Sequence, residues 1–305
     1  MTAGVITRGH FPRDLKPVVA YYFGKAYKDH PELYAKMFDS EKTSDAYEEY
    51  ASYAGLSAAQ LKTEGGSISY DSAQELFNQR IQILTYGLGF KVTREMIEDG
   101  KVMKFAQRKA VELKKACMDN KEIRAADVLN NAFNSSFTGA DGKELCATDH
   151  PILDGTYANE PSTAADLSEA ALENAIIDLR KAKNNRGLRM HVTPTMPIIP
   201  PDLEFELCRI LDGKERVGTA DREINALNKK SYLGMTPVIN PYLTDSDAWF
   251  LKTDVDHGLI HLDRRGMEIE SDNDHDTQNA SYIATFRDAF FWNDPRGIYG
   301  SPGAA

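Results

Sequence analysis

The stretch YIATFRDAFFWNDPRGIYG, residues 282–300, decides how the chain ends. Five of its apolar residues share one parity, and they are Tyr282, Ala284, Phe286, Phe290 and Trp292. Arg287 has the opposite parity, so the alternation predicts a strand with one strongly apolar face. The strand is expected to stop at residues 294–297, because Pro295 cannot donate to a sheet and Gly297 permits a reversal. Such an end packs into a core or an interface, and nothing in it suggests catalysis.

Two alternating apolar patterns of opposite parity come earlier in the chain. The first consists of Phe77, Ile81 and Ile83, and the second of Leu84, Tyr86, Leu88, Phe90 and Val92. The change of parity between Ile83 and Leu84 predicts a bend or a bulge. Gly87 and Gly89 face away from the second pattern, which predicts that another group approaches the backbone closely there.

A long helix is predicted directly after these strands. Thr93 is a suitable N-cap, and Glu95 stands beside the positive end of the helix dipole. One stripe at helical spacing is formed by Met96, Met103, Ala106, Ala110, Leu113 and Cys117. The stripe predicts a helix over about residues 93–117, and a second helix is expected over about residues 122–134.

The rest of the chain mixes helices with short strands. A helix capped by Ser168 is expected to end at residues 184–187, and another helix is expected to begin at Pro201. Strands are expected at residues 188–192, 235–239, 248–252, 258–262, 266–270 and 281–292. Because strands and helices do not alternate regularly, the predicted fold class is α+β.

Residues 40–75 are polar, rich in tyrosine and glycine-tipped. The segment has few aliphatic residues, so it cannot bury much apolar area and is not expected to form a core of its own. We interpret it as a long excursion that needs a partner surface, with a disordered loop as the alternative. The tyrosines would anchor it, since they offer large apolar area with a polar end. The candidate contact residues are Tyr47, Tyr50, Tyr53, Gly65 and Gly66.

The composition is that of an ordinary soluble globular protein of 305 residues. A net charge of −10 with no basic block argues against tight binding of nucleic acid. An acidic chain would repel DNA held nearby, as suits a container wall, although solubility alone is the simpler explanation. Cys117, Cys146 and Cys208 are widely spaced and odd in number, which predicts no disulfide framework and a reducing compartment. We expect no secretory signal and no membrane span.

Motifs for catalysis or cofactor binding are incomplete. Gly87 and Gly89 begin a dinucleotide-binding pattern, but Val92 occupies the third glycine position. The acidic residues at 272–276 resemble the opening of a calcium loop, whose required glycine and glutamate are missing. Three further pairs would need the fold to complete a site: His257 with His261, Cys146 with His150, and Asp141 with Asp149. We therefore expect no enzyme activity, no cofactor and no metal site.

Several segments together resemble the major capsid proteins of tailed bacteriophages. They are LTYGLGFKVTREMIED at 84–99, LCATDHP at 145–151, IIPPDLE at 198–204, AWFL at 248–251, and the closing stretch 286–300. The first resembles the junction of a strand with the spine helix, the second the segment after a hairpin, and the third a strand-to-helix turn. The last two resemble the closing strands. The resemblance covers roughly residues 75–300, and the nearest subgroup is the Mu-like major head subunit.

This resemblance implies the Hong Kong 97-type capsid fold, with a spine helix over the predicted 93–117. The implied divisions are an N-terminal arm at 1–40, an extended β loop at 41–80, a peripheral domain at 81–164 and 256–305, and an axial domain at 165–255. The extended loop would lie on a neighbouring subunit, which agrees with its shortage of apolar residues.

The resemblance also implies a virion capsid protein, assembled in the host cytoplasm, whose hexamers and pentamers form an icosahedral shell around double-stranded DNA. The implied partners are other copies, a portal, separate scaffolding and protease proteins, the packaged DNA without specificity, and a decoration protein where one exists. No motif for covalent cross-linking is evident. The alternatives are an encapsulin-type shell of a cellular nanocompartment and a soluble α/β nucleotide-dependent enzyme.

Overall fold

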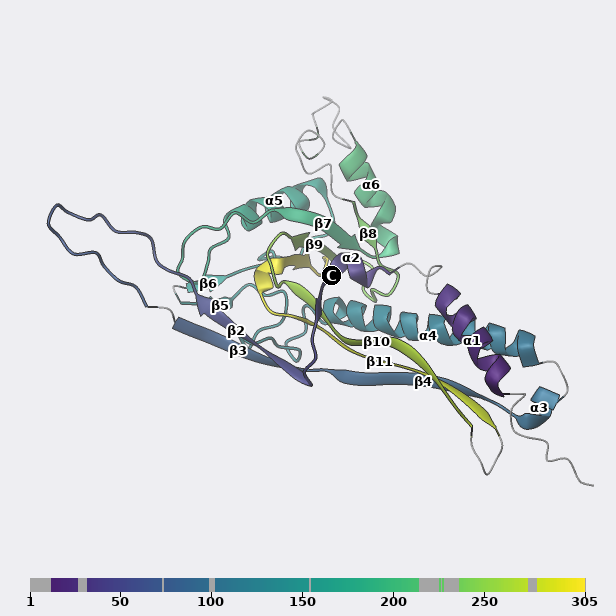
Figure 1. Cartoon of the computed structure of the whole chain (residues 1–305). Coiled ribbons are helices and arrows are strands. Elements are labelled where there is room, and N and C mark those ends of the chain that lie inside the picture. The colour runs from purple at the N-terminus through teal and green to yellow at the C-terminus, as the bar shows by residue number, and fades with distance from the viewer. Residues whose placement is uncertain are drawn as a thin grey trace, which may run out of the picture.

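The computed structural model describes residues 12–26, 32–72, 74–98, 102–153, 155–213, 225, 227, 236–273 and 279–304. Residues 1–11 of the expected N-terminal arm, and residues 274–276 of the calcium-loop pattern, lie outside these ranges. Figure 1 shows an elongated body built around two sheets. A long projection at one end consists of residues 47–72 and 74–82, and we call it the arm, as distinct from the N-terminal arm. Helices and strands are mixed without regular alternation, which confirms the α+β class.

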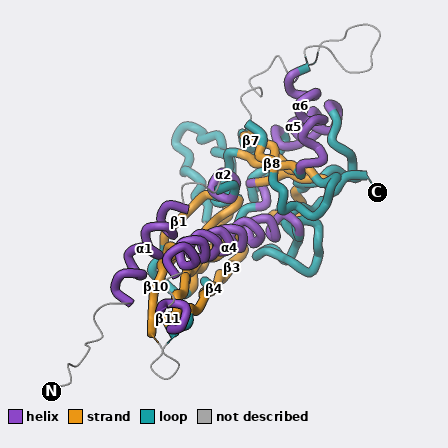
Figure 2. The backbone as a smooth tube through the Cα atoms, turned by 90° about the vertical axis from the view of Figure 1, so that its right-hand side faces the viewer, coloured by secondary structure: helices purple, strands orange, loops and turns teal. Residues whose placement is uncertain are grey.

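The first sheet has four strands and is covered by helices on one face. In spatial order its strands are β1 (Asp39–Lys42), β10 (Leu259–Asn273), β11 (Ala280–Trp292) and β4 (Leu84–Val92). β1 pairs with β10 in parallel, and the other neighbours are antiparallel. Figure 2 shows α4 (Val102–Asn130) and α1 (Pro12–Ala26) side by side over this sheet. A sheet covered in this way buries its apolar face against the helices.

The strand predicted at 281–292 is β11, and its apolar parity faces the helices. Tyr282 and Phe286 are buried in the core that β11 shares with α4 and α1. The expected stop is the 3-10 helix η3 (Pro295–Gly297), where Asp294 accepts the N–H of Arg296 at 2.9 Å. The chain then forms β12 (Ile298–Ser301), which the sequence did not predict, because this short strand is stabilised by a distant strand of the second sheet.

The predicted helices at 93–117 and 122–134 are in fact one helix, α4, which begins at Val102. A separate short helix, α3 (Arg94–Glu98), precedes it. The expected break is wrong because Cys117 and Met118 are both buried, in two adjoining cores. This packing keeps Asp119 and Asn120, which follow Met118, helical despite their low intrinsic helix propensity.

β3 (Gln74–Gln82) and β4 follow one another with a break at the buried Ile83, as the change of parity predicts. β3 pairs with β2 (Tyr47–Ala54) and not with the first sheet. A Cβ at Gly89 would lie 2.7 Å from the carbonyl oxygen of Tyr282 and 3.1 Å from Cγ1 of Ile283. The predicted close approach is therefore made by β11 of the same chain.

The second sheet supports most of the residues between 165 and 255. Its strands in spatial order are β12, β9 (Trp249–Thr253), β7 (Pro194–Ile199) and β8 (Val238–Ile239). The helices α5 (Glu169–Arg180) and α6 (Glu204–Asp212) share a core with it that includes Leu172, Leu207, Trp249 and Tyr299. Ser168 caps α5 as predicted, accepting the N–H of Ala171 at 3.2 Å. The remaining short elements are α2 (Tyr34–Met37), β5 (His150–Ile152), β6 (Gly155–Tyr157) and η1 (Pro201–Leu203).

Three predicted strands differ in the structure. Residues 188–192 make a single bridge, between Lys183 and Arg189, and the strand begins only at Pro194. The side-chain oxygen of Asn184 accepts the N–H groups of residues 186 and 188 at 2.9 Å each, which holds this segment in a turn. The strands expected at 258–262 and 266–270 form one bulged strand, β10.

A buried carboxylate joins α4 to the first sheet. Asp288 of β11 shares the parity of the apolar face, and its side chain is fully buried. Its oxygens lie 2.5 Å from Nη2 of Arg124, 3.2 Å from Nζ of Lys121 and 3.4 Å from Nε2 of His261. Burial by itself would raise the pKa of Asp288, but the hydrogen bond from His261 and the two cations outweigh burial and lower this pKa. The ionised carboxylate therefore fixes α4 on the sheet.

Removal of this carboxylate is expected to destabilise the subunit strongly. Asp288→Ala leaves the buried Lys121 and the half-buried Arg124 without their counter-charge, which costs about 3–5 kcal/mol in comparable buried pairs. The free energy of unfolding, measured in urea on the unassembled subunit, should fall by a similar amount. The control Glu206→Ala, at an exposed position of α6, should change it by less than about 0.5 kcal/mol. Equal losses in the two variants would contradict the role of Asp288.

The lowered pKa also sets the pH dependence of this stabilisation. Because Asp288 has a lower pKa folded than unfolded, its stabilisation is complete above the unfolded pKa and is lost as pH falls through the folded one. The difference in unfolding free energy between wild type and Asp288→Ala should therefore shrink at acid pH. A difference that grew on acidification would be the opposite of this expectation.

Candidate assembly surfaces

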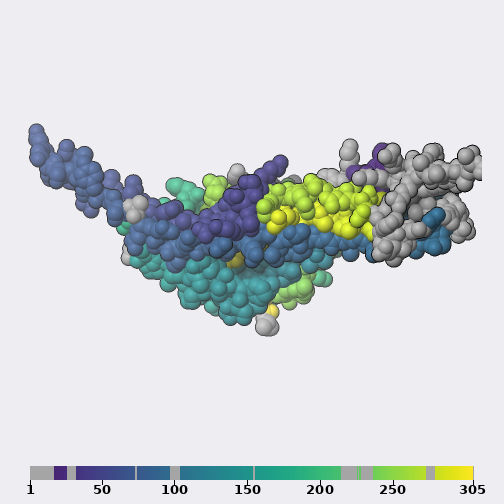
Figure 3. All heavy atoms as spheres, turned by 60° about the horizontal axis from the view of Figure 1, so that its bottom comes forward, coloured from purple at the N-terminus to yellow at the C-terminus, as the bar shows by residue number. Residues whose placement is uncertain are grey.

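A strongly exposed apolar surface lies on residues 55–72 of the connection between β2 (Tyr47–Ala54) and β3 (Gln74–Gln82). Figures 1 and 3 show this loop extending away from the body. Its exposed large apolar side chains are Leu56, Leu61, Ile68 and Tyr70. Leu61 is 93% exposed and Tyr70 is 94% exposed, so neither is covered by its own chain. Apolar residues gathered on a projecting loop indicate contact with another protein molecule.

A tight turn forms part of this loop. The N–H of Gly66 donates to the carbonyl oxygen of Thr63 at 3.0 Å, and Gly65 has a φ of 75°. A positive φ at the third residue fits a type II turn, where glycine is favoured. A Cβ at Gly66 would lie 2.6 Å from Oγ1 of Thr63, so this position also suits glycine. The two predicted contact glycines thus shape the turn, and the exposed Glu64 stands within it.

The three tyrosines predicted to anchor the segment have different surroundings. Tyr47 is 44% exposed and Tyr53 is 62% exposed. Tyr50 lies against the body, because its hydroxyl donates to Glu41 at 2.7 Å and its ring centre is 5.1 Å from that of Phe291. Burial, followed by the hydrogen bond to Glu41, raises the pKa of Tyr50, so its hydroxyl stays protonated. Tyr50 therefore holds the arm to its own chain, and the other two tyrosines keep exposed surface.

The predicted excursion over 40–75 has two parts. Residues up to 54 contact their own chain, since β1 pairs with β10 and β2 is held by Tyr50. For this part the expectation that order comes from adjoining molecules is wrong, because β1 completes the first sheet. Residues 55–72 leave the body with only a few polar contacts near their ends.

Arg186 makes most of these contacts. Its Nη2 donates to the carbonyl oxygen of Ser72 at 2.8 Å, and its Nε donates to that of Gly55 at 3.1 Å. Nη2 also lies 3.4 Å from Oδ1 of Asp71. Gly55 and Ser72 stand at the two ends of the loop, so one guanidinium holds both. We call Arg186 with these three partners the arm latch.

A second link crosses the loop beside the arm latch. Oδ2 of Asp71 accepts the backbone N–H of Ser57 at 2.8 Å and its hydroxyl at 2.7 Å. The hydrogen bonds from Ser57, side chain first, lower the pKa of Asp71 to about 2, and the charge of Arg186 has a smaller effect in the same direction. Asp71 is therefore ionised at neutral pH and well into the acid range.

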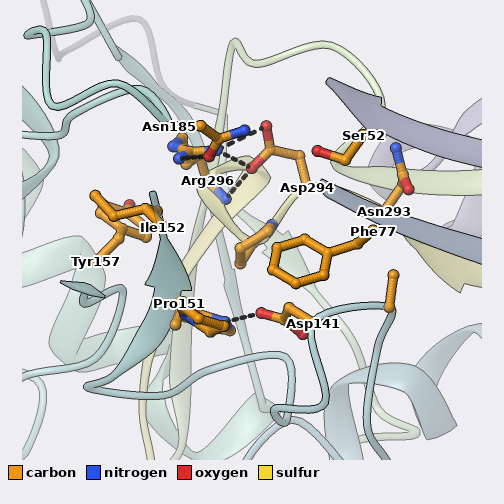
Figure 4. A pocket seen from close by; sticks show the side chains of 13 residues that line it. Ser52, Phe77, Asp141, Pro151, Ile152, Tyr157, Asn185, Asn293, Asp294 and Arg296 are labelled. Carbon is orange, nitrogen blue, oxygen red and sulfur yellow. Dashed lines mark hydrogen bonds and ion pairs between the residues drawn. The ribbon is translucent and has the colours of Figure 1, made fainter. Parts of the chain in front are cut away.

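A small pocket lies beneath the root of the arm (Figure 4). It has about 30 Å³ of free space, which suits a water molecule and not a substrate. Asp141 lies 2.6 Å from Nδ1 of His150 on one side. On the other side Arg296 forms an ion pair with Asp294 and donates to Asn185 at 2.6 Å. These groups bond to one another, which fits a structural role.

The acidic residues and the histidine of the candidate catalytic pairs bond to other groups. Asp141 contacts His150, whereas Asp149 forms an exposed ion pair with Lys143. Burial raises the pKa of the Cys146 thiol well above its ordinary value, which suppresses the reactive thiolate.

The two histidines considered for zinc also have separate partners. His257 lies in a turn with a φ of 58° and contacts Glu41, whereas His261 contacts Asp288. Within the ranges that the structure describes, no three histidine, cysteine or acidic side chains are grouped to hold a metal ion. No helix of the described residues is long and apolar enough to cross a membrane.

Sequence reasoning missed the residues that hold the loop. It included Arg186 only as part of a helix end, and it did not identify Ser57 or Asp71. The partners of Arg186 are more than a hundred residues away in the chain. The one available signal is the run of polar turn residues at 184–187, which indicates a turn but not its partner.

Comparison with known proteins identifies the family. The sequence profile of the family described as phage capsid protein matches residues 77–301, which is most of the chain. No curated protein matches the chain.

Solved shell proteins share the fold at low sequence identity. A chain from Microbacterium phage Oxtober96 matches with a TM-score of 0.54 and 10% identity, over 90% of this chain and 91% of that one. The capsid of a native GTA particle matches with a TM-score of 0.53 and 12% identity, over 90% and 91%. The SrpI encapsulin of Synechococcus elongatus matches with a TM-score of 0.53 and 9% identity, over 90% and 88%. This likeness shows the Hong Kong 97-type capsid fold, and with the family profile it shows that the chain belongs to the phage capsid protein family and is a major capsid protein.

Proposed function

We propose that this chain is the major head subunit of a tailed bacteriophage, and that its arm binds neighbouring copies in the icosahedral shell around double-stranded DNA. The observation that carries the role of the arm is the exposed loop 55–72, with apolar side chains such as Leu61 and Tyr70, fixed at its base by the arm latch. A loop positioned before binding loses less conformational entropy when a neighbour covers it. Burial of its apolar side chains then favours association.

The proposed contacts between copies are Tyr47, Tyr53 and the turn at Gly65 and Gly66. Both tyrosines present exposed ring surface, and aromatic rings bury a large area when a partner covers them. Tyr50 acts indirectly, because it fixes the root of the arm to Glu41 and Phe291.

The proposed divisions follow the two sheets. An N-terminal arm at 1–40 and an extended loop at 41–80 precede a peripheral domain at 81–164 and 256–305 on the first sheet, with an axial domain at 165–255 on the second. Because β12 pairs with β9, we place residues 298–304 with the axial domain instead. Copies would meet head-to-tail around five- and six-fold axes.

Further partners are proposed from the family alone. They are a portal, separate scaffolding and protease proteins, the packaged DNA without sequence specificity, and a decoration protein where one exists. Assembly in the host cytoplasm and a nearest relationship to the Mu-like group belong to the same proposal. No catalytic role is proposed, because the members of the candidate pairs bond to other groups or, in the case of Cys146, are buried with a raised pKa.

A cellular nanocompartment shell is the second candidate. The encapsulin matches the fold as closely as the phage chain does, so the fold does not separate the two functions. The family profile favours the phage. Particles purified from their natural source should contain DNA, and particles that held enzymes without a genome would favour the nanocompartment.

Shortening the loop tests the role of the arm. We replace residues 58–70 by Gly-Ser-Gly, which keeps β2, β3, the arm latch and the link from Ser57 to Asp71. The urea midpoint of the unassembled subunit should stay unchanged, because nearly all of the removed residues are exposed among the residues that the structure describes. The yield of shells in electron micrographs and sedimentation should fall at least about tenfold, because several arm contacts act together. Shells of normal size and yield would contradict the proposal.

Point substitutions separate the apolar contact from loop length. Leu61→Ser with Tyr70→Ser should lower shell yield in the same direction as the shortened loop. The control is Phe205→Ser, since Phe205 is 71% exposed on α6 and lies outside the arm. An equal loss in the control would mean that general surface polarity, and not the arm, controls yield.

The arm latch should restrict the direction of the loop in the unassembled subunit. Cys208 is exposed while Cys117 and Cys146 are buried, so Ser69→Cys yields a chain with two sites for spin labels. Arg186→Gln removes bonds to both ends of the loop and should broaden the distance distribution between the labels. The matched control Arg180→Gln, also in the region of α5 but outside the arm latch, should leave the distribution unchanged. A wild-type distribution as broad as that of Arg186→Gln would refute the latch.

The same labels report the ionisation of Asp71. Its pKa is about 2 when folded, so the link to Ser57 is complete above the unfolded pKa and is lost only as pH falls through the folded one. The distance distribution should therefore be as narrow at pH 4 as at neutral pH, because Asp71 is ionised at both values. Asp71→Asn should broaden it at both values.

A further inference from the structure

Two arginines stand opposite one another on the face of the first sheet that α4 does not cover. Arg265 of β10 and Arg287 of β11 are direct cross-strand partners. Arg287 has the opposite parity to Phe286, which is buried in the core with α4, so the pair lies on the other face. Like charges in this position destabilise a sheet, so the pair needs an explanation.

Neither arginine has a counter-charge among the described residues. Arg265 donates to Oγ1 of Thr285 at 2.8 Å, and no ion pair joins either guanidinium to a described carboxylate. The Nε of each arginine is buried and has no hydrogen-bond partner among the residues that the structure describes. Because these buried Nε atoms are closed to a ligand from outside the subunit, the terminal nitrogens of the two partly exposed guanidinium groups are the donors that can receive an anion.

We propose that Arg265 and Arg287 bind a carboxylate of a neighbouring copy in the shell, and that Glu64 of the neighbour's arm supplies it. This inference rests on the proposed function, since it requires neighbouring copies. A guanidinium presents a planar fork of donors that matches a carboxylate. One carboxylate between the two arginines would relieve their repulsion.

The root of the arm lies on the same face as the arginine pair. Phe291 shares the parity of Arg287, and its ring packs against Tyr50 of β2. In a head-to-tail arrangement, an arm that leaves this face continues onto the equivalent face of the next copy. Residues 55–64 can extend by up to about 30 Å, at 3.3 Å per residue.

Glu64 is favoured as the ligand by its position and charge. It is exposed within the turn from Thr63 to Gly66, whereas Asp71, the other acid of the loop, is already bonded to Ser57 and Arg186. A protein carboxylate is favoured over a DNA phosphate because the net charge of −10 opposes the close approach of DNA.

A double-mutant cycle on shell stability tests the pairing. Glu64→Gln and Arg287→Gln should each raise the concentration of free subunit in equilibrium with shells by about tenfold, and the double variant by no more than either alone. Independent effects would multiply to about a hundredfold, and this result would overturn the proposal. The matched control Glu75→Gln, an exposed acid of β3, should stay within about twofold of wild type.

The unassembled subunit provides a second readout. Arg287→Gln removes repulsion within the sheet, so the urea midpoint of the subunit should stay constant or rise while the shell weakens. A fall in both would indicate a structural role inside the subunit and overturn the proposal. Normal shells that retain less DNA would identify the anion as phosphate, which also overturns it. A wild-type chain that forms no shells would instead refute the proposed function itself, so the two failures are distinguishable.

Discussion

The position of α4 on the first sheet depends on one buried carboxylate, because an ionised group removed from water requires partners at fixed places. Asp288 has such partners in Lys121 and Arg124 of α4 and in His261 of β10. His261 extends the network further, since its Nδ1 lies 3.2 Å from the hydroxyl of Ser40 in β1. One charge therefore connects the long helix, the middle of the sheet and the strand from which the arm begins.

This platform explains how a loop with almost no packing of its own can have a defined direction. β1 and Tyr50 fix the start of the arm, and Arg186 bonds to both ends of the loop. The described residues between Gly55 and Ser72 are left without a covering surface. The subunit has therefore already lost much of the entropy that binding a free loop would cost, while its apolar residues remain available to a neighbour.

Sequence patterns predicted the elements whose signal is local, and they failed where distant partners decide. The alternation at 282–292 and the break at Ile83 were recognisable because each strand must bury one face. The helix α4 passes through Asp119 and Asn120 because cores formed with remote strands override local propensity. The arm latch could not be predicted, since two acceptors of Arg186 are backbone carbonyls, which any residue supplies. The order of weak motifs indicated the family, whereas the pairing of β12 with β9 joins strands that are distant in the chain, so no local pattern predicted it.

The arrangement of the arm also determines which kind of assembly the chain can form. Figures 1 and 3 show the end of the loop well outside the body, and the arm latch holds both of its ends in that direction. The exposed residues of the loop therefore lie away from the sheet of their own subunit. If the loop of one copy contacts a different surface on the next copy, the contact is heterologous. Such a contact repeats from copy to copy until the ring of copies closes. Under the proposed function, closure into rings instead of filaments would depend on the angle at which the loop leaves β2 and β3, and Tyr50 and Arg186 are the side chains that hold its base.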